Sequence, residues 1–287
     1  MGLMRFKEIK GGSFQMGTDD HIGFDEDYEG PPTIVRVPSF SMADTPVTNA
    51  DFDDFIAATA YQTVAERLGS SFVFELLIPE EERVTYQHVA GAPWWLLVPG
   101  ADWQHPYGAE SSNIDLDNHP VVHVALEDAL AYCQWSHSQL PTEAQWEYAA
   151  GAGTATTYPW GESLVDEHGF HANTWQGDFP NDNTAEDGFV GTAPVKSYEP
   201  NSNGLYQIIG NVWEWCRNPR YTLLDDFNAE QFKLGKVPAA GEYAIRGGSF
   251  LCHCSYCNRY RTAARNGVDL QSTSSHLSFR CIKEVSS

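Results

Sequence analysis

The spacing of apolar and polar residues near the N-terminus predicts short, half-buried strands. Residues 6–18 alternate on either side of the pair Gly11-Gly12, a pattern typical of two strands joined by a turn. Between residues 33 and 42, apolar side chains alternate with polar ones, as in one strand with a single buried face. We therefore expect β-structure to open the chain.

Apolar residues that recur every three or four positions predict three helices further along the chain. Thr48 can cap a helix whose apolar residues recur every three or four positions. A second helix starts near Leu126, with the same spacing on one stripe. Thr142 and Gln145 have the spacing of a capping box, which predicts the start of a third helix.

The remaining sequence favours loops. The chain contains 24 glycines and 16 prolines, becomes rich in turns after Gly151, and contains no segment with the composition of a linker. Its 42% of hydrophobic residues suffice for a substantial core. Short strands and isolated helices in mixed order predict one α+β domain over residues 1–287, with little regular secondary structure.

The charge balance narrows the classes of partner. The formal net charge is −22, from 39 acidic and 17 basic residues. Nucleic acid is not an expected partner, because its phosphates would be repelled. A basic peptide or a hard cation such as calcium suits this charge.

Targeting signals are not evident in the sequence. No run of eighteen apolar residues exists, so we expect no membrane span. The first residues lack the apolar stretch of a signal peptide, and Phe6 stands where N-myristoylation at Gly2 would need Ser or Thr. We therefore expect a cytoplasmic protein whose six cysteines are mostly reduced.

Three of the cysteines cluster within residues 246–261, at Cys252, Cys254 and Cys257, and arginines follow them at Arg259, Arg261 and Arg265. Cationic neighbours favour thiolate, which is both the nucleophile and the ligand for soft metals. The spacing does not match a zinc site with two cysteines and two histidines, and the Cys-x-x-Cys at its end lacks a thioredoxin context. The alternative is that these cysteines are small buried hydrophobic residues.

Two oxygen-rich segments are candidates for a hard cation. Residues 178–189 supply carboxylates and amides on a turning loop, although a solvated polar loop has the same composition. Glu214 stands between Trp213 and Trp215. A carboxylate in such apolar surroundings needs a cation, a raised pKa or a salt bridge to an arginine.

Taken together, these segments resemble the formylglycine-generating enzymes, the sulfatase-modifying-factor family. The resemblance covers nearly the whole chain in order. The matching runs are Gly11–Gly17, Thr45–Asn49, His119–Val124, Leu140–Tyr148, Tyr158–Gly161, Asn173–Gly177, Glu186–Phe189, Gly210–Trp215 and Gly247–Arg265. Cys252 and Cys257 within Gly-Gly-Ser-Phe-Leu-Cys-His-x-Ser-Tyr-Cys are specific to the enzymes themselves, whereas several other runs occur across the wider fold superfamily.

The resemblance implies a single loop-rich domain, distantly similar to C-type lectins, that acts as an enzyme. It implies oxidation by O2 of one cysteine in a sulfatase to Cα-formylglycine, within an extended Cys-x-Pro-x-Arg segment. Cys252 and Cys257 would hold copper(I), Ser249 would lie beside them, and Tyr256 would belong to the wall of the pocket. A monomer is expected.

The resemblance also implies two calcium sites and one cysteine pair. The first calcium site would comprise Asn173, the Thr174 carbonyl, Asp187 and the Phe189 carbonyl. The second would comprise Gln207, Gly210, Val212 and Glu214, partly through backbone oxygens. Cys133 and Cys281 would lie close together, and in a reducing compartment this proximity does not require a disulfide bond between them.

The sequence departs from the family pattern near the expected peptide groove. Cys254 replaces a polar or charged residue, residues 268–271 replace an Asn-Thr-Pro-Asp stretch, and His276 and Ser278 stand where Asn and Gly are expected. An oxidase for a different thiol substrate and a non-catalytic lectin-like module are therefore alternatives. An iron-dependent sulfoxide synthase of the same fold would need a histidine site that this sequence does not contain.

Overall fold

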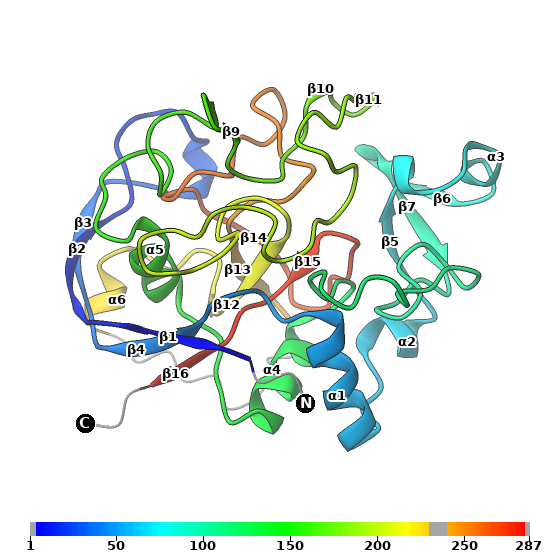
Figure 1. Ribbon diagram of the computed structural model, residues 1–287, viewed down its shortest axis with the longest axis horizontal. Helices are drawn as coiled ribbons and strands as arrows, with labels where there is room; N and C mark the ends of the chain where they lie inside the picture. The colour runs from blue at the N-terminus through cyan, green and yellow to red at the C-terminus, as the bar shows by residue number, and fades with distance from the viewer. Residues whose placement is uncertain (1–3, 230–239, 285–287) are drawn as a thin grey trace.

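Short strands and helices alternate along the chain, and coil connects them (Figure 1). This computed structural model describes residues 4–229 and 240–284, so Gly2 lies outside the described residues. The helices are α1 (Asn49–Thr59), α2 (Val64–Leu68), α3 (Glu80–Arg83), α4 (Leu126–Trp135), α5 (Glu143–Gly151) and α6 (Asp226–Ala229), with 3-10 turns η1 (Asp25–Asp27) and η2 (Glu75–Leu77).

The strands are short and form several small sheets. In chain order they are β1 (Phe6–Ile9), β2 (Gly12–Met16), β3 (Thr33–Val37), β4 (Phe40–Ala43), β5 (Ser70–Phe74), β6 (Gln87–Val89), β7 (Ala92–Pro99), β8 (Val165–Asp166), β9 (Gly169–Phe170), β10 (Gly177–Asp178), β11 (Asp182–Asn183), β12 (Trp213–Pro219), β13 (Glu242–Arg246), β14 (Asn266–Asp269), β15 (Leu277–Ser278) and β16 (Ile282–Glu284). The sheet orders are β1-β4-β16, β14-β13-β12-β15, β5-β7-β6 and the pairs β2-β3, β8-β9 and β10-β11.

The predicted pairing at the N-terminus is wrong in two respects. β1 and β2 do not form a hairpin, because β1 pairs with β4 and β2 pairs with β3. The strand predicted over residues 33–42 is divided at Pro38, which has no N–H for a ladder. Gly11 permits this crossing, since a Cβ there would lie 2.5 Å from the nitrogen of Ser39.

The three predicted helices are confirmed, and capping by a threonine explains the starts of α1 and α5. The Thr48 hydroxyl accepts the backbone N–H of Asp51 at 3.2 Å at the start of α1. The Thr142 hydroxyl accepts the N–H of Gln145 at 3.1 Å, and the Gln145 side chain accepts the Thr142 N–H at 2.9 Å. Each capping box satisfies two donors that the first helical turn leaves free.

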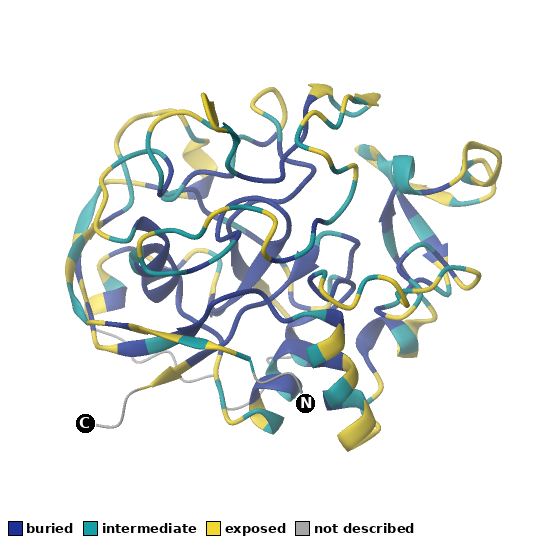
Figure 2. Cartoon of the chain, in the orientation of Figure 1, coloured by how far each residue is buried: buried dark blue, intermediate teal, exposed yellow. Residues whose placement is uncertain are grey.

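The core lies around the central sheet β14-β13-β12-β15, with α5 packed against β12 and β13. Figure 2 shows this central region as the most continuously buried part of the chain. Cys133 of α4 and Cys281 before β16 are buried there with their sulfurs 3.7 Å apart, as expected. Within residues 4–229 and 240–284, no helix is long and apolar enough to cross a bilayer.

Candidate active site

The segment after β13 folds into a tight turn that carries the clustered cysteines. Gly247 and Gly248 have φ of 98° and 76°, a region that side chains with a Cβ rarely adopt. A Cβ at Gly248 would lie 2.8 Å from the Cβ of Tyr260. The backbone N–H groups of residues 256–258 all donate to the carbonyl of His253, at 3.0 to 3.1 Å. The turn therefore reverses the chain between the two predicted ligands.

Cys252 and Cys257 face each other across this turn. Both are buried, at 3% and 6% exposed, and their thiols form a hydrogen bond. Burial raises the pKa of Cys252 well above its ordinary value. The hydrogen bond from Cys252 lowers the pKa of Cys257, and Arg259 adds to this effect. Cys257 is thus the member of the pair that more readily holds a negative charge.

Ser249 and Tyr256 border the pair on two sides. Ser249 is fully buried, and its backbone N–H donates to the sulfur of Cys252 at 3.4 Å. Tyr256 is 40% exposed and stacks on Phe179, with ring centroids 4.2 Å apart. Trp94 contacts Tyr256 edge to face at 5.1 Å. Tyr256, Phe179 and Trp94, here termed the aromatic wall, form an apolar surface beside the thiols.

Phe179 is a site residue that sequence reasoning missed. Phe179 lies in the oxygen-rich segment 178–189, whose composition indicates a cation site and gives no sign that its aromatic side chain belongs to the thiol site. Trp94 completes the aromatic wall, in contact with both Phe179 and Tyr256. Cys254 is exposed, and its sulfur lies 3.8 Å from Nε2 of His253.

Two of the three arginines do not act as predicted. Arg261 is buried and binds the carboxylate of Glu29 at 2.7 and 2.8 Å. Arg265 is buried against Glu143, with a shortest distance of 2.7 Å. Arg259 lowers the pKa of Cys257, and its guanidinium also binds Asp27. Their positive charges are therefore used to hold the segment in place.

The acidic loop of residues 19–29 places two of its carboxylates in the interior. Asp27 and Glu29 are buried and bind the arginines that follow Cys257. The loop also contacts the turn directly, because the Asn258 side chain donates to the carbonyl of Ile22 at 3.4 Å. An acidic residue that pairs with a distant arginine cannot be recognised from local composition.

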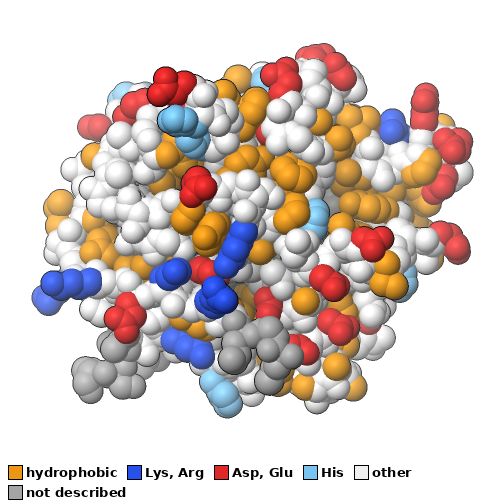
Figure 3. Space-filling model, viewed as in Figure 1, with side chains coloured by type: hydrophobic (Ala, Val, Ile, Leu, Met, Phe, Trp, Pro, Cys, Tyr) orange, Lys and Arg blue, Asp and Glu red, His pale blue; other side chains and the backbone are white. Residues whose placement is uncertain are grey.

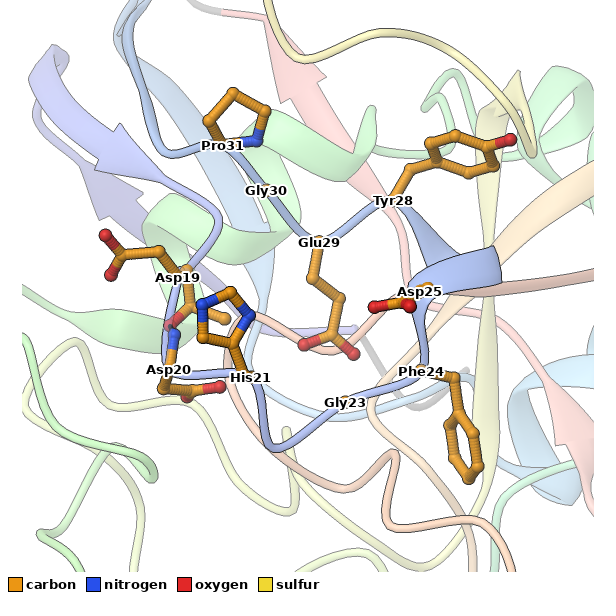
Figure 4. A pocket seen from close by; sticks show the side chains of 11 residues that line it. Asp19, Asp20, His21, Gly23, Phe24, Asp25, Tyr28, Glu29, Gly30 and Pro31 are labelled. Atoms are coloured by element: carbon orange, nitrogen blue, oxygen red, sulfur yellow. Dashed lines mark hydrogen bonds between the residues drawn. The ribbon is translucent and has the colours of Figure 1, made fainter.

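A hollow of about 280 Å³ lies within this loop, between residues 18 and 31 (Figure 4). The carboxylate of Glu29 points toward Gly23, where a Cβ would lie 2.4 Å from its Oε1. The exposed carboxylates on its rim are Asp19, Asp20 and Asp25. Acidic side chains also gather near α3 at the edge of the face shown in Figure 3. In the described ranges, no three His, Cys, Asp or Glu side chains are grouped as metal ligands.

The first predicted calcium site has the polar groups that a hard cation needs. Within the part of the chain that the structure describes, Asn173 Oδ1 and Thr174 Oγ1 are buried and have no hydrogen-bond partner. Burial raises the pKa of Asp187, whose carboxylate accepts the N–H groups of Thr174 at 3.1 Å and Phe189 at 3.0 Å. The side-chain amide of Gln176 donates to the carbonyl of Thr174. A cation beside Asn173 would satisfy its oxygen and favour ionised Asp187, so these residues fit calcium.

The second predicted calcium site fits less well. Both carboxylate oxygens of Glu214 accept hydrogen bonds from Arg280, and one also accepts the indole N–H of Trp146 at 2.8 Å. The amide oxygen of Gln207 accepts from Asn211, and its amide nitrogen donates to the carbonyl of Pro194 at 2.7 Å. For Glu214, the structure shows the salt bridge to an arginine.

The backbone oxygens at Gly210 and Val212 remain a prediction. The Gly210 carbonyl accepts the N–H of Val212 at 2.8 Å, so this part of the chain forms a tight local turn. A calcium ion in the second site would depend on such carbonyl groups, because the side chains of Glu214 and Gln207 already have protein partners.

The fold and the site define a class: loop-rich α+β proteins in which two buried thiols face each other beside an aromatic wall. A family model described as the sulfatase-modifying factor enzyme 1-like domain matches residues 6–285, so the chain belongs to this family. It is 46% identical over 287 residues to a formylglycine-generating enzyme of Mus musculus, covering 98% of this chain and 75% of that protein.

The chain is also similar to two further relatives and to one solved structure. The chain is 46% identical to a formylglycine-generating enzyme of Streptomyces coelicolor, covering 96% of this chain and 88% of that protein. It is also 39% identical to a Bos taurus protein named inactive C-alpha-formylglycine-generating enzyme 2, covering 96% and 86%. The structure of PvdO from Pseudomonas aeruginosa superposes with a TM-score of 0.63 at 24% identity, covering 98% and 94%, which supports the fold alone.

Proposed function

We propose that this protein is a formylglycine-generating enzyme that matures sulfatases. It oxidises the cysteine of a Cys-x-Pro-x-Arg segment to Cα-formylglycine. The observation that carries this proposal is the facing, buried pair Cys252 and Cys257 at the edge of an accessible aromatic wall. The names of the two relatives at 46% identity support the same activity.

The donor set fits copper(I). Two sulfurs within hydrogen-bonding range, shielded from water, form the soft site that this ion prefers over harder N and O ligands. Cys252 and Cys257 would hold it, and Cys257 loses its proton more readily because its pKa is lowered. When bound, copper would supply a soft position for the substrate sulfur and access to O2 chemistry.

The other residues of the site bind and orient the substrate. Tyr256 and Phe179 offer flat apolar faces to an extended peptide with a proline. The acidic rim of the hollow beside Arg259 attracts the arginine of the substrate segment. The hydroxyl of buried Ser249 hydrogen-bonds the sulfur of Cys252 and can stabilise negative charge on it.

The electron balance requires a second reductant. Conversion of a thiol-bearing carbon to an aldehyde, with release of hydrogen sulfide, removes two electrons from the substrate. O2 accepts four electrons when it is reduced to water. The remaining two electrons are supplied by an added thiol, which becomes a disulfide.

The experiment combines the protein with copper, a thiol reductant, air and a Cys-x-Pro-x-Arg peptide, followed by mass spectrometry of the product. We expect about one Cu(I) per chain and aldehyde formation, because the two thiolates form one site. Cys252→Ala or Cys257→Ala should abolish both, whereas Cys216→Ala, which removes a buried thiol elsewhere in the core, should retain both. Stoichiometric copper binding that survives both site substitutions would contradict the proposal.

A non-catalytic role is the second candidate, and it is supported by the 39% identity to a protein named inactive C-alpha-formylglycine-generating enzyme 2. A binding module of this fold would hold the peptide without forming aldehyde and would not need the thiol pair. Turnover of another thiol peptide without turnover of the Cys-x-Pro-x-Arg peptide would indicate an altered substrate. The departures from the family pattern at His276 and Ser278 are consistent with such a change.

A further inference from the structure

The side chain of Ser249 lies between a histidine and one of the two facing cysteines. Ser249 Oγ lies 3.0 Å from Nδ1 of His276 and accepts the N–H of Leu251 at 3.3 Å. It also hydrogen-bonds the sulfur of Cys252. Because Ser249 is fully buried, these contacts are shielded from water and each has a larger effect than it would at the surface.

His276 is held rigidly in this position. Its carbonyl accepts the N–H of Trp213 at 2.8 Å, and the adjacent Ser275 donates to the carbonyl of Phe72 at 2.9 Å. Its ring meets Trp95 edge to face, with centroids 4.7 Å apart. The imidazole also lines a surface hollow of about 190 Å³ together with Trp95 and Phe72. The fold therefore fixes which ring atom faces Ser249.

The donors around Ser249 Oγ determine where its hydrogen points. Burial lowers the pKa of His276 to about 3, so the ring is neutral at pH 7 and one of its nitrogens carries hydrogen. A hydroxyl oxygen accepts two hydrogen bonds and donates one. Leu251 supplies the first donor. When Nδ1 of His276 carries the ring hydrogen and supplies the second, the hydroxyl hydrogen is left for Cys252.

We propose that His276 is a positioning residue that, by donating from Nδ1 to Ser249, directs the Ser249 hydroxyl hydrogen to the sulfur of Cys252. This inference rests on the proposed function for its effect on rate. A hydrogen bond to a charged group contributes enough to change a rate about ten- to hundredfold. The ring acts only through Ser249, since the structure shows no direct contact between His276 and either thiol among its hydrogen bonds.

The test uses the copper-loaded protein, four variants of the site and one control variant. His276→Phe retains a flat ring against Trp95 and removes the donor, whereas His276→Asn retains an N–H at similar depth. Ser249→Ala and the double variant with His276→Phe test whether both residues act through one hydrogen bond. His119→Phe is the matched control, because this histidine also contacts a hydroxyl, that of Thr192, outside the site. Thermal melts check that each variant folds.

His276→Phe should lower kcat about ten- to hundredfold with KM changed less than about twofold, and His276→Asn should restore most of the rate. The double variant should be no slower than Ser249→Ala alone. In metal-free protein, alkylation of Cys252 by iodoacetamide at fixed pH should slow in His276→Phe, measured against Cys257. Additive losses in the double variant, an unrescued Asn variant or unchanged alkylation would overturn the inference. If wild-type protein makes no aldehyde, the proposed function is wrong. The alkylation comparison would still test whether His276 positions the Ser249 hydroxyl.

Discussion

Replacing Arg280 by Met tests how much of the stability depends on a buried ion pair. Arg280 is completely buried and binds the carboxylate of Glu214 through two nitrogens, with a shortest distance of 2.8 Å. It also donates to the carbonyls of Ala43 at 3.0 Å and Tyr206 at 2.8 Å. In Arg280→Met, the indole of Trp146 remains as a donor to Glu214, and both carbonyls lose this donor.

Removal of one partner from a buried ion pair typically costs about 3–5 kcal/mol, because the other charge stays buried. We expect a loss near the middle of this range, about 4 kcal/mol at pH 7, and a fall in Tm of about 10 °C for a chain of this size. Without Arg280, burial raises the pKa of Glu214, so the folded variant binds a proton that the unfolded chain lacks. Stability of the variant therefore recovers as pH falls, and the loss at pH 5 is smaller than at pH 7.

Urea unfolding followed by tryptophan fluorescence at pH 7 and pH 5 measures both effects. Arg67→Met is the matched control, because the pair Arg67–Glu127 is about half exposed, and its loss should cost less than about 1 kcal/mol. The double variant Arg280→Met/Glu214→Gln should be more stable than Arg280→Met alone. A loss below about 1 kcal/mol at pH 7, or one that does not change with pH, would refute the reasoning. Rescue of Arg280→Met by calcium would instead show that the Glu214 carboxylate binds this cation.

Three further results are expected. Calcium at about 100 times its Kd should stabilise the wild type by about 2.7 kcal/mol and Asp187→Asn much less, measured by thermal melts; equal stabilisation would exclude this ligand. Gly248→Ala should lower Tm more than Gly69→Ala, because both have positive φ but only Gly248 has atoms within 3 Å of the added Cβ. Burial lowers the pKa of His123 to about 4, so the unfolded chain binds a proton first and stability falls as pH drops from about 6.5 to 4. His123→Gln should flatten that slope in urea titrations, and an unchanged slope would refute this assignment.

Features with local causes could be predicted from the sequence. The starts of α1 and α5 follow from Thr48 and Thr142, whose hydroxyls cap the next turn regardless of the rest of the fold. The approach of Cys252 and Cys257 follows from a turn within ten residues, with glycines where φ is positive. The family resemblance added the role of this pair, which spacing alone left open.

Features that depend on distant partners could not be predicted. β1 pairs with residues 31 to 37 positions further along the chain, and β2 with residues 17 to 25 positions away. The alternation within residues 6–18 does not specify which strand is the partner. The burial of Asp27 and Glu29 depends on arginines more than 200 residues further along the chain. The side chain of Glu214 was assigned to calcium by resemblance, whereas Arg280 neutralises it in the structure.

The same long-range ion pairs explain how a loop can hold a precise site without regular secondary structure. The segment that carries the thiols is followed by Arg261 and Arg265, which are anchored to Glu29 and Glu143 in the interior. Each guanidinium makes at least two charged hydrogen bonds. A shift of the backbone would break them and leave a buried charge without its partner, which is energetically costly. Arg259 is the exception, since it influences Cys257 while it is bound to the acidic loop. Arg261 and Arg265, which the sequence analysis linked to thiolate formation, thus hold the backbone of this segment in place. The chemistry of Cys252 and Cys257 depends on that fixed backbone.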